Sequence, residues 1–63
     1  MRIKDLRVSA GMTQRELADK LGISNAAVAQ WETGDNRPTV TNLERMADIF
    51  GVTIDYILGR DSA

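Results

Sequence analysis

The chain has 63 residues, 43% hydrophobic and 27% charged, with a net charge of −1 at pH 7 and neither cysteine nor histidine. This length suits one domain over residues 1–63, and the composition excludes disordered, collagen-like and coiled-coil chains. Without cysteine and histidine the chain lacks disulfide bonds, thiolate metal sites and the usual general base, so we expect no metal, no cofactor and no enzyme.

The first predicted helix lies close to the N-terminus. Met1 to Asp5 contain no long apolar run and end in a carboxylate, unlike a signal peptide. No window approaches the roughly 18 apolar residues of a membrane span. Ile3 and Leu6 have helical spacing, and Gly11 marks the end of this helix, which has no clear N-cap.

The second helix has a well-marked start and end. It begins at Thr13, which forms a capping box with Glu16, since the hydroxyl and the carboxylate can each accept a hydrogen bond from an unpaired backbone N–H group. It ends at Gly22, because glycine easily adopts the left-handed conformation found just past a helix. Its apolar stripe consists of Leu17, Ala18 and Leu21.

The third predicted helix has one apolar face and one open face. Ser24 is its N-cap and Gly34 its stop. Val28 and Trp31 have the spacing of inward-pointing residues. The opposite face collects four small or polar residues, Asn25, Ala26, Ala29 and Gln30. We expect this face to remain open to a partner.

Two further helices complete the chain. The fourth is capped by Thr39, with Pro38 just outside it, and the fifth by Thr53. Their apolar stripes are Val40, Leu43, Met46, Ala47 and Phe50, and then Ile54, Ile57 and Leu58. The residues after Gly59, Arg60 to Ala63, are expected to be loose. The prediction is an all-α, compact five-helix bundle whose core includes Leu17, Leu21, Trp31, Leu43, Met46 and Phe50.

The junction between the second and third helices predicts a helix-turn-helix. Leu21 to Ser24 is too short for an extended loop, so the helices must cross steeply, with the small Ala18 at their close approach. In the stretches AGMTQRELADKLGIS, WETGDNRP and MADIFGVTIDYILG, the sequence resembles helix-turn-helix domains of the phage-repressor and Cro type. The resemblance implies a lambda-repressor-like fold and double-stranded DNA as partner, with the third helix in the major groove.

The residue types on the third helix suit base reading. Asn25 and Gln30 can each present the paired donor and acceptor that match adenine, while Ala26 and Ala29 suit a thymine methyl group. The expected contacts to the DNA backbone come from Gln14, Arg15, Ser24, Asn36 and Arg37. Plain capping is the alternative for Ser24, and a solvated loop charge for Arg37. The resemblance also implies a partly buried structural ion pair between Arg7 and Glu32.

The charge balance weighs against strong DNA binding. The isoelectric point is about 5.1, whereas many DNA-binding domains exceed about 9. Residues 1–20 hold five basic and three acidic residues, a net charge of +2, while residues 21–63 carry a net charge of −3. We therefore expect weak non-specific affinity with strong salt sensitivity.

One recognition helix reads few base pairs, so we expect a homodimer, at least on DNA. The expected interface is the apolar C-terminal segment, with Val52, Ile54, Tyr56, Ile57 and Leu58. The prediction is a cytoplasmic, nucleoid-associated transcriptional regulator, most simply a repressor, with no membrane or small-molecule ligand. The alternative is a protein-binding module of an antitoxin or adapter type, since a fold does not dictate its function.

Overall fold

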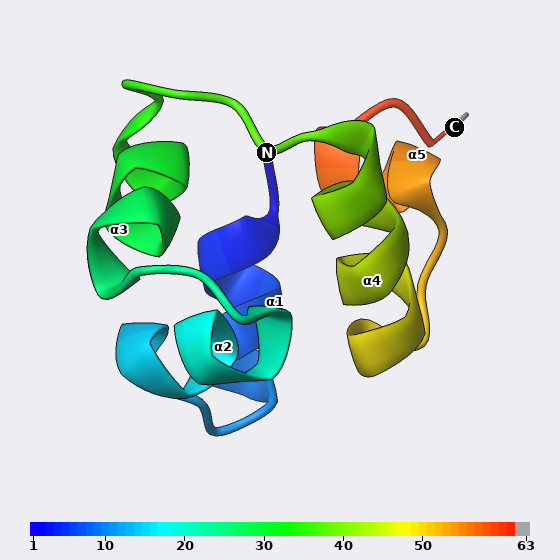
Figure 1. The fold of residues 1–63 in the computed structure, drawn as a ribbon. Helices are drawn as coiled ribbons and strands as arrows, with labels where there is room; N and C mark the ends of the chain where they lie inside the picture. The colour runs from blue at the N-terminus through cyan, green and yellow to red at the C-terminus, as the bar shows by residue number, and fades with distance from the viewer. Residues whose placement is uncertain (62–63) are drawn as a thin grey trace.

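Residues 1–61, the part of the chain described by the computed structural model, form five helices and no strand (Figure 1). The helices are α1 Ile3–Ser9, α2 Gln14–Leu21, α3 Asn25–Thr33, α4 Val40–Phe50 and α5 Ile54–Leu58. The all-α, five-helix prediction is therefore confirmed for these residues. Thr13 is the N-cap of α2, whose first helical residue is Gln14.

Side-chain hydroxyl groups start four of the helices, as predicted. Each accepts a hydrogen bond from the backbone N–H three residues later, and the four caps are Thr13, Ser24, Thr39 and Thr53. In return, the backbone N–H of Thr13 donates to Oε1 of Glu16 at 2.9 Å, which completes the capping box. Arg2, at the start of α1, has no side-chain cap. These caps are local, so the boundaries of α2 to α5 follow from short stretches of sequence.

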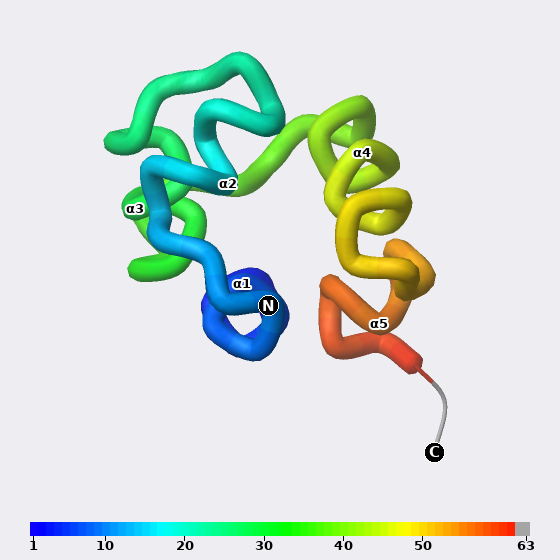
Figure 2. Tube along the Cα trace, turned by 90° about the horizontal axis from the view of Figure 1, so that it is seen from below, coloured from blue at the N-terminus to red at the C-terminus, as the bar shows by residue number. Residues whose placement is uncertain are grey.

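The helices lie in two groups that face each other across the core. Figures 1 and 2 show α1, α2 and α3 on one side and α4 and α5 on the other. Backbone N–H of Arg2 donates to the carbonyl oxygen of Ile57 at 2.8 Å, so the start of the chain is tied to α5. This arrangement leaves the outer side of α3 away from α4 and α5.

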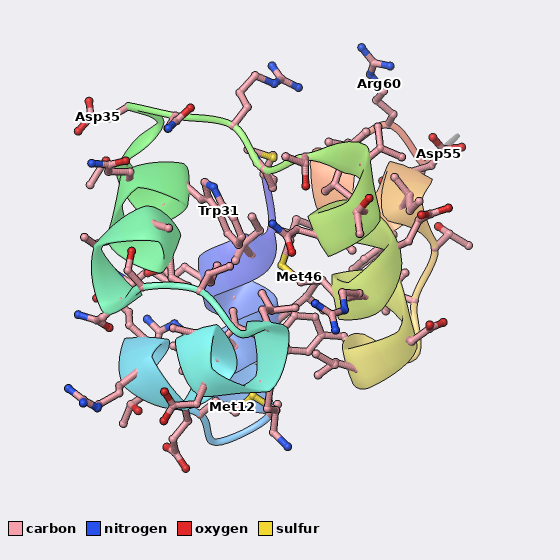
Figure 3. All side chains as sticks on the ribbon, in the orientation of Figure 1. Met12, Trp31, Asp35, Met46, Asp55 and Arg60 are labelled. Carbon is pink, nitrogen blue, oxygen red and sulfur yellow. The ribbon has the colours of Figure 1, made fainter. Side chains whose placement is uncertain are left out.

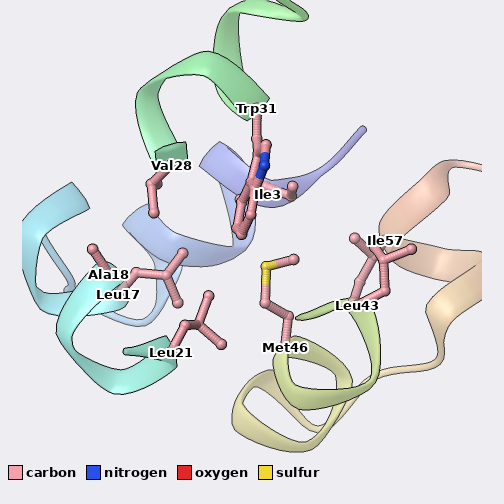
Figure 4. Packing of buried hydrophobic residues seen from close by; sticks show 9 residues of the cluster. All are labelled: Ile3, Leu17, Ala18, Leu21, Val28, Trp31, Leu43, Met46 and Ile57. Atoms are coloured by element: carbon pink, nitrogen blue, oxygen red, sulfur yellow. The ribbon is translucent and has the colours of Figure 1, made fainter. Parts of the chain in front are cut away.

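The core fills the space between the two groups. Its buried residues are Ile3, Leu17, Ala18, Leu21, Val28, Trp31, Leu43, Met46 and Ile57. Figure 4 shows Met46 of α4 lying between Leu21 and Ile57 and facing Trp31. Since Met46 is fully buried, α4 is held to the first three helices mainly by apolar packing.

Two core predictions for α4 need correction. Val40, predicted in the buried stripe, is 68% exposed because it is the first residue of the helix and lies beyond the packed interior. Phe50, predicted in the core, is only half-buried and packs against the edge of the cluster from the last turn. Helical spacing places Phe50 correctly against the core, whereas Val40 does not pack against it, so the extent of burial depends on how far the neighbouring helices reach.

Of the residues after Gly59, which are expected to be loose, Arg60 and Asp61 make contacts with the rest of the chain. Backbone N–H of Arg60 donates to the carbonyl oxygen of Asp55 at 2.8 Å, and the Asp61 carboxylate pairs with Arg2 at 2.6 Å. The Arg2 guanidinium also lies 4.2 Å from the ring centroid of Tyr56. The rest of that expectation, Ser62 and Ala63, lies outside the described residues. No helix within residues 1–61 has the length and apolar character needed to span a bilayer.

Candidate nucleic-acid interface

The corner between α2 and α3 is made by Gly22. Its φ is 69°, in the left-handed region, and a Cβ atom there would meet nothing within 4 Å. The requirement for glycine is therefore one of backbone conformation and not of space. Backbone N–H of Ile23 donates to the carbonyl oxygen of Ala18 at 3.0 Å, and the side chain of Ala18 is buried at the crossing. These contacts set the direction in which α3 leaves α2.

One face of α3 is open along its length. Val28 and Trp31 are buried and point into the molecule, and Figure 3 shows Trp31 directed toward Met46. On the opposite face, three of the four predicted base-contacting residues are exposed and the fourth, Ala29, is half-buried: Asn25, Ala26, Ala29 and Gln30. In the part of the chain that is described, neither α4 nor α5 covers this face (Figure 1). Two amides and two small apolar side chains are thus presented together.

Thr33 extends the same face at its C-terminal end and is not among the residues predicted from the sequence. Thr33 follows Gln30 by three residues, so helical spacing could have placed it there. Its hydroxyl lies 3.2 Å from the carbonyl oxygen of Gln30 and 3.0 Å from Oδ2 of Asp35. Asp35 points outward from the loop after α3 (Figure 3). This carboxylate is unfavourable for a DNA backbone at that edge.

A buried ion pair holds α3 to α1, as the resemblance implied. Arg7 Nε donates to Glu32 Oε2 at 2.7 Å and Nη2 donates to Oε1 at 3.1 Å. The side chains are 11% and 4% exposed. Arg7 Nη1 also donates to the carbonyl oxygen of Met12 at 2.8 Å. The planar guanidinium therefore joins α1, the loop before α2 and the last turn of α3 in a fixed geometry.

The charge state of Glu32 is set by this pair. Burial by itself raises the pKa of Glu32, but the hydrogen bonds from Arg7 and Gln14 and the positive charge of Arg7 outweigh burial. The pKa of Glu32 is therefore held below its ordinary value. The same hydrogen bond raises the pKa of Arg7. Near neutral pH both groups are charged, and each neutralises the other.

Some of the residues predicted to contact the DNA backbone form hydrogen bonds within the chain, and most of them are exposed. Gln14 is half-buried, and its Nε2 donates to Glu32 Oε1 at 3.1 Å. The exposed Ser24 caps α3 through its Oγ. Three exposed residues of the set lie on either side of α3 in sequence: Arg15 in the first turn of α2, and Asn36 and Arg37 in the loop after α3. Figure 1 shows these two segments at opposite ends of α3.

The predicted dimer residues are less exposed than expected. Ile57 has no exposed surface, because it belongs to the core of its own chain. That part of the prediction is corrected: this side chain has no surface to offer a partner. Val52, Ile54 and Leu58 are half-buried against the core. Tyr56 is 37% exposed and lies beside Arg2. A pairing surface on this segment is therefore narrower than predicted.

Comparisons with known proteins agree with this geometry. A family model described as helix-turn-helix matches residues 3–57. The chain is 37% identical over 60 residues to the HTH-type transcriptional regulator ImmR of Bacillus subtilis. It is 35% identical over 57 residues to the HTH-type transcriptional activator BcrR of Enterococcus faecalis. Over 59 residues it is 36% identical to the cryptic phage CTXphi transcriptional repressor RstR of Vibrio cholerae.

These matches cover most of this chain but only part of each relative. They span 95%, 90% and 94% of the chain, and 47%, 28% and 53% of the lengths of ImmR, BcrR and RstR, respectively. The chain thus spans about half of these relatives or less. No solved structure matches it significantly.

Proposed function

The chain belongs to the helix-turn-helix family of the phage-repressor and Cro type, and on this premise we propose that it is a sequence-specific DNA-binding regulator of transcription that reads the major groove with α3. The observation that carries the proposal is the open face of α3, with Asn25, Ala26 and Gln30 exposed while Val28 and Trp31 anchor the helix inside. A helix held in this way can enter a groove without any rearrangement of its own chain.

Base recognition is assigned to the amides and alanines of α3. Asn25 and Gln30 can each pair with the N6 and N7 edge of adenine, and Ala26 and Ala29 offer contact to a thymine methyl group. Half-sites that contain A·T pairs are therefore proposed. Thr33 adds a hydroxyl at the far end of this face, although its contact with Asp35 competes for it.

The phosphate contacts are assigned to the two ends of α3. Arg15 and Arg37 are exposed and supply positive charge, while the first turns of α2 and α3 offer unpaired backbone N–H groups and the positive end of each helix. Such contacts fix the register on the duplex without reading its sequence. Because the chain has few of them and a net charge of −1, non-specific affinity should be weak.

We also propose that two copies bind a two-fold site. The longest dimension of the domain is 32 Å, so one copy covers about one turn of the duplex, which rises about 34 Å per turn. Pairing is assigned to the exposed parts of Val52, Ile54, Tyr56 and Leu58. We propose repression, because a bound dimer obstructs a promoter by occupancy alone, whereas activation requires a further contact with polymerase.

Selection of bound sequences from a random DNA pool tests the proposal. The expected product is a motif repeated in two-fold symmetry, with half-site centres about 10 base pairs apart. Titration of that site and of random DNA at two salt concentrations then measures specificity and salt dependence. A chain that binds no DNA at low salt contradicts the proposal, and a motif without two-fold repetition contradicts the dimer.

A second candidate function is a protein-binding module of the antitoxin or adapter type. The small apolar side chains Ala26 and Ala29 on the open face, and the carboxylate of Asp35 at its end, favour this alternative. Capture of one enriched protein partner, together with no binding to DNA at low salt, would support it. The same titration therefore separates the two functions.

A further inference from the structure

Arg45 forms a hydrogen bond that no feature of the sequence predicted. Its Nη1 donates to the carbonyl oxygen of Leu21 at 3.1 Å. Leu21 is the last residue of α2, directly before the glycine corner. Carbonyl groups in the last turn of a helix have no partner within the helix, and a positive group there also interacts favourably with the helix dipole. Arg45 therefore completes the end of α2 from outside that helix.

This bond joins the two groups of helices at the corner. α2 packs against both α3 and α4, and the residue after Arg45 is Met46, which is fully buried near Leu21 (Figure 4). Among residues 1–61, the other hydrogen bonds between the two groups come from Arg2 to α5 and the chain after it. Arg45 is thus the polar link nearest to the helix-turn-helix.

We propose that Arg45 is a positioning residue that fixes the angle of the α2–α3 corner relative to α4 and α5. The inference rests on the proposed function, in which α3 reads bases and the α5 segment pairs two copies. The distance between the two recognition helices then depends on how rigidly the corner is held to the pairing segment. A small change in the angle between α2 and α3 at Leu21 displaces the whole of α3. Loss of the bond should therefore weaken simultaneous binding to two half-sites at a fixed spacing.

The expected signature differs from that of a phosphate contact. A residue that only contacts phosphate contributes equally to a half-site and to a two-fold site, and its removal lowers the slope of log K against log salt by about one. A positioning residue acts on the two-fold site alone. Arg45 is itself an exposed residue, so water can replace its bond to Leu21 and the fold persists without it.

The test compares Arg45→Gln with Arg60→Gln, which removes the same charge from another exposed arginine. Affinity is measured for the selected two-fold site, for one half-site and for two-fold sites lengthened or shortened by one base pair. Relative to Arg60→Gln, Arg45→Gln should weaken binding to the two-fold site about three- to tenfold, as expected for one hydrogen bond. It should leave the half-site affinity and the salt slope unchanged, and it should reduce the preference for the correct spacing.

Two further measurements keep the outcomes distinct. Hydrogen exchange at the amides of Gly22 and Ile23 should be faster in Arg45→Gln, and Arg45→Lys, which keeps the charge, should recover part of the affinity. Equal behaviour of Arg45→Gln and Arg60→Gln overturns the inference, as does equal weakening of half-site and two-fold site with a lower salt slope. A wild-type chain that binds no DNA overturns the proposed function as well. The two outcomes that overturn only the inference about Arg45 leave the proposed function intact.

Discussion

At the scale of single residues, the Arg7–Glu32 ion pair is costly to bury but restricts how α3 packs against α1. Taking both charges out of water costs free energy that their attraction and hydrogen bonds must offset. Glu32 receives three such bonds, two from Arg7 and one from Gln14. The arrangement leaves no buried side-chain nitrogen or oxygen without a partner in the described residues. The pair therefore specifies one orientation of α3 against α1.

Replacement of Glu32 by alanine should lower the free energy of unfolding by about 3–5 kcal/mol, because it leaves the guanidinium of Arg7 buried without its counter-charge. Urea denaturation followed by circular dichroism measures the effect. Glu44→Ala, which removes an exposed carboxylate on α4, serves as the control and should have little effect. Equal stability of the two variants would contradict the structural role of the pair.

The same carboxylate should make stability depend on pH. The pKa of Glu32 is lower in the folded chain than its ordinary value of 4.5, so its contribution is complete above that ordinary value and is lost as pH falls through the folded pKa. The unfolding free energy of the wild type should therefore approach that of Glu32→Gln as the solution is acidified. Glu16, whose pKa is also lowered through its bonds with Thr13, is present in both chains and cancels. A difference that stays constant down to strongly acidic pH would contradict the assignment.

At the scale of elements, the corner depends on one backbone conformation. Gly22 has φ of 69° and open space where a side chain would lie. Gly22→Ala should therefore destabilise the chain by about 1–2 kcal/mol through backbone strain alone. Gly22→Asn should cost less, because asparagine tolerates the left-handed region. Thermal unfolding of the two variants checks the order, and a neutral Gly22→Ala would show that the corner can relax.

The two kinds of contact assigned to the interface should separate in binding measurements. Gln30→Ala should weaken binding to the selected site by about 1–3 kcal/mol and leave binding to random DNA unchanged, because it removes a base contact. Arg15→Gln should weaken both and lower the salt slope by about one, because it removes a phosphate contact. Fluorescence titration at several salt concentrations measures both effects. A Gln30→Ala chain that loses affinity equally on every sequence would remove this residue from base reading.

At the scale of the whole molecule, stability depends on the apolar contact between the two groups of helices. Met46 is fully buried between them, whereas Val40 on the same helix is 68% exposed. Met46→Ala should therefore cost about 2–5 kcal/mol, a large part of the stability of so small a domain. Val40→Ala is the matched control and should have little effect. Chemical denaturation of both variants tests whether this interface holds the fold together.

The helices and their order can be predicted from the sequence alone, because caps, stops and apolar spacing act within a few residues of one another. Thr13 with Glu16, and the turn at Gly22, are of this kind. The sequence also supported the open face of α3, since the buried Val28 and Trp31 define the opposite side by helical geometry.

Which of these side chains are buried, and which polar groups form hydrogen bonds, can be seen only in the folded chain. The burial of Ile57, the exposure of Val40 and the bond from Arg45 to Leu21 each depend on segments far apart in sequence. Local sequence patterns do not predict contacts between such distant segments, because packing between helices is set by the sum of many weak contacts around the core. The position of the recognition helix relative to the rest of the chain is therefore a property of the folded molecule.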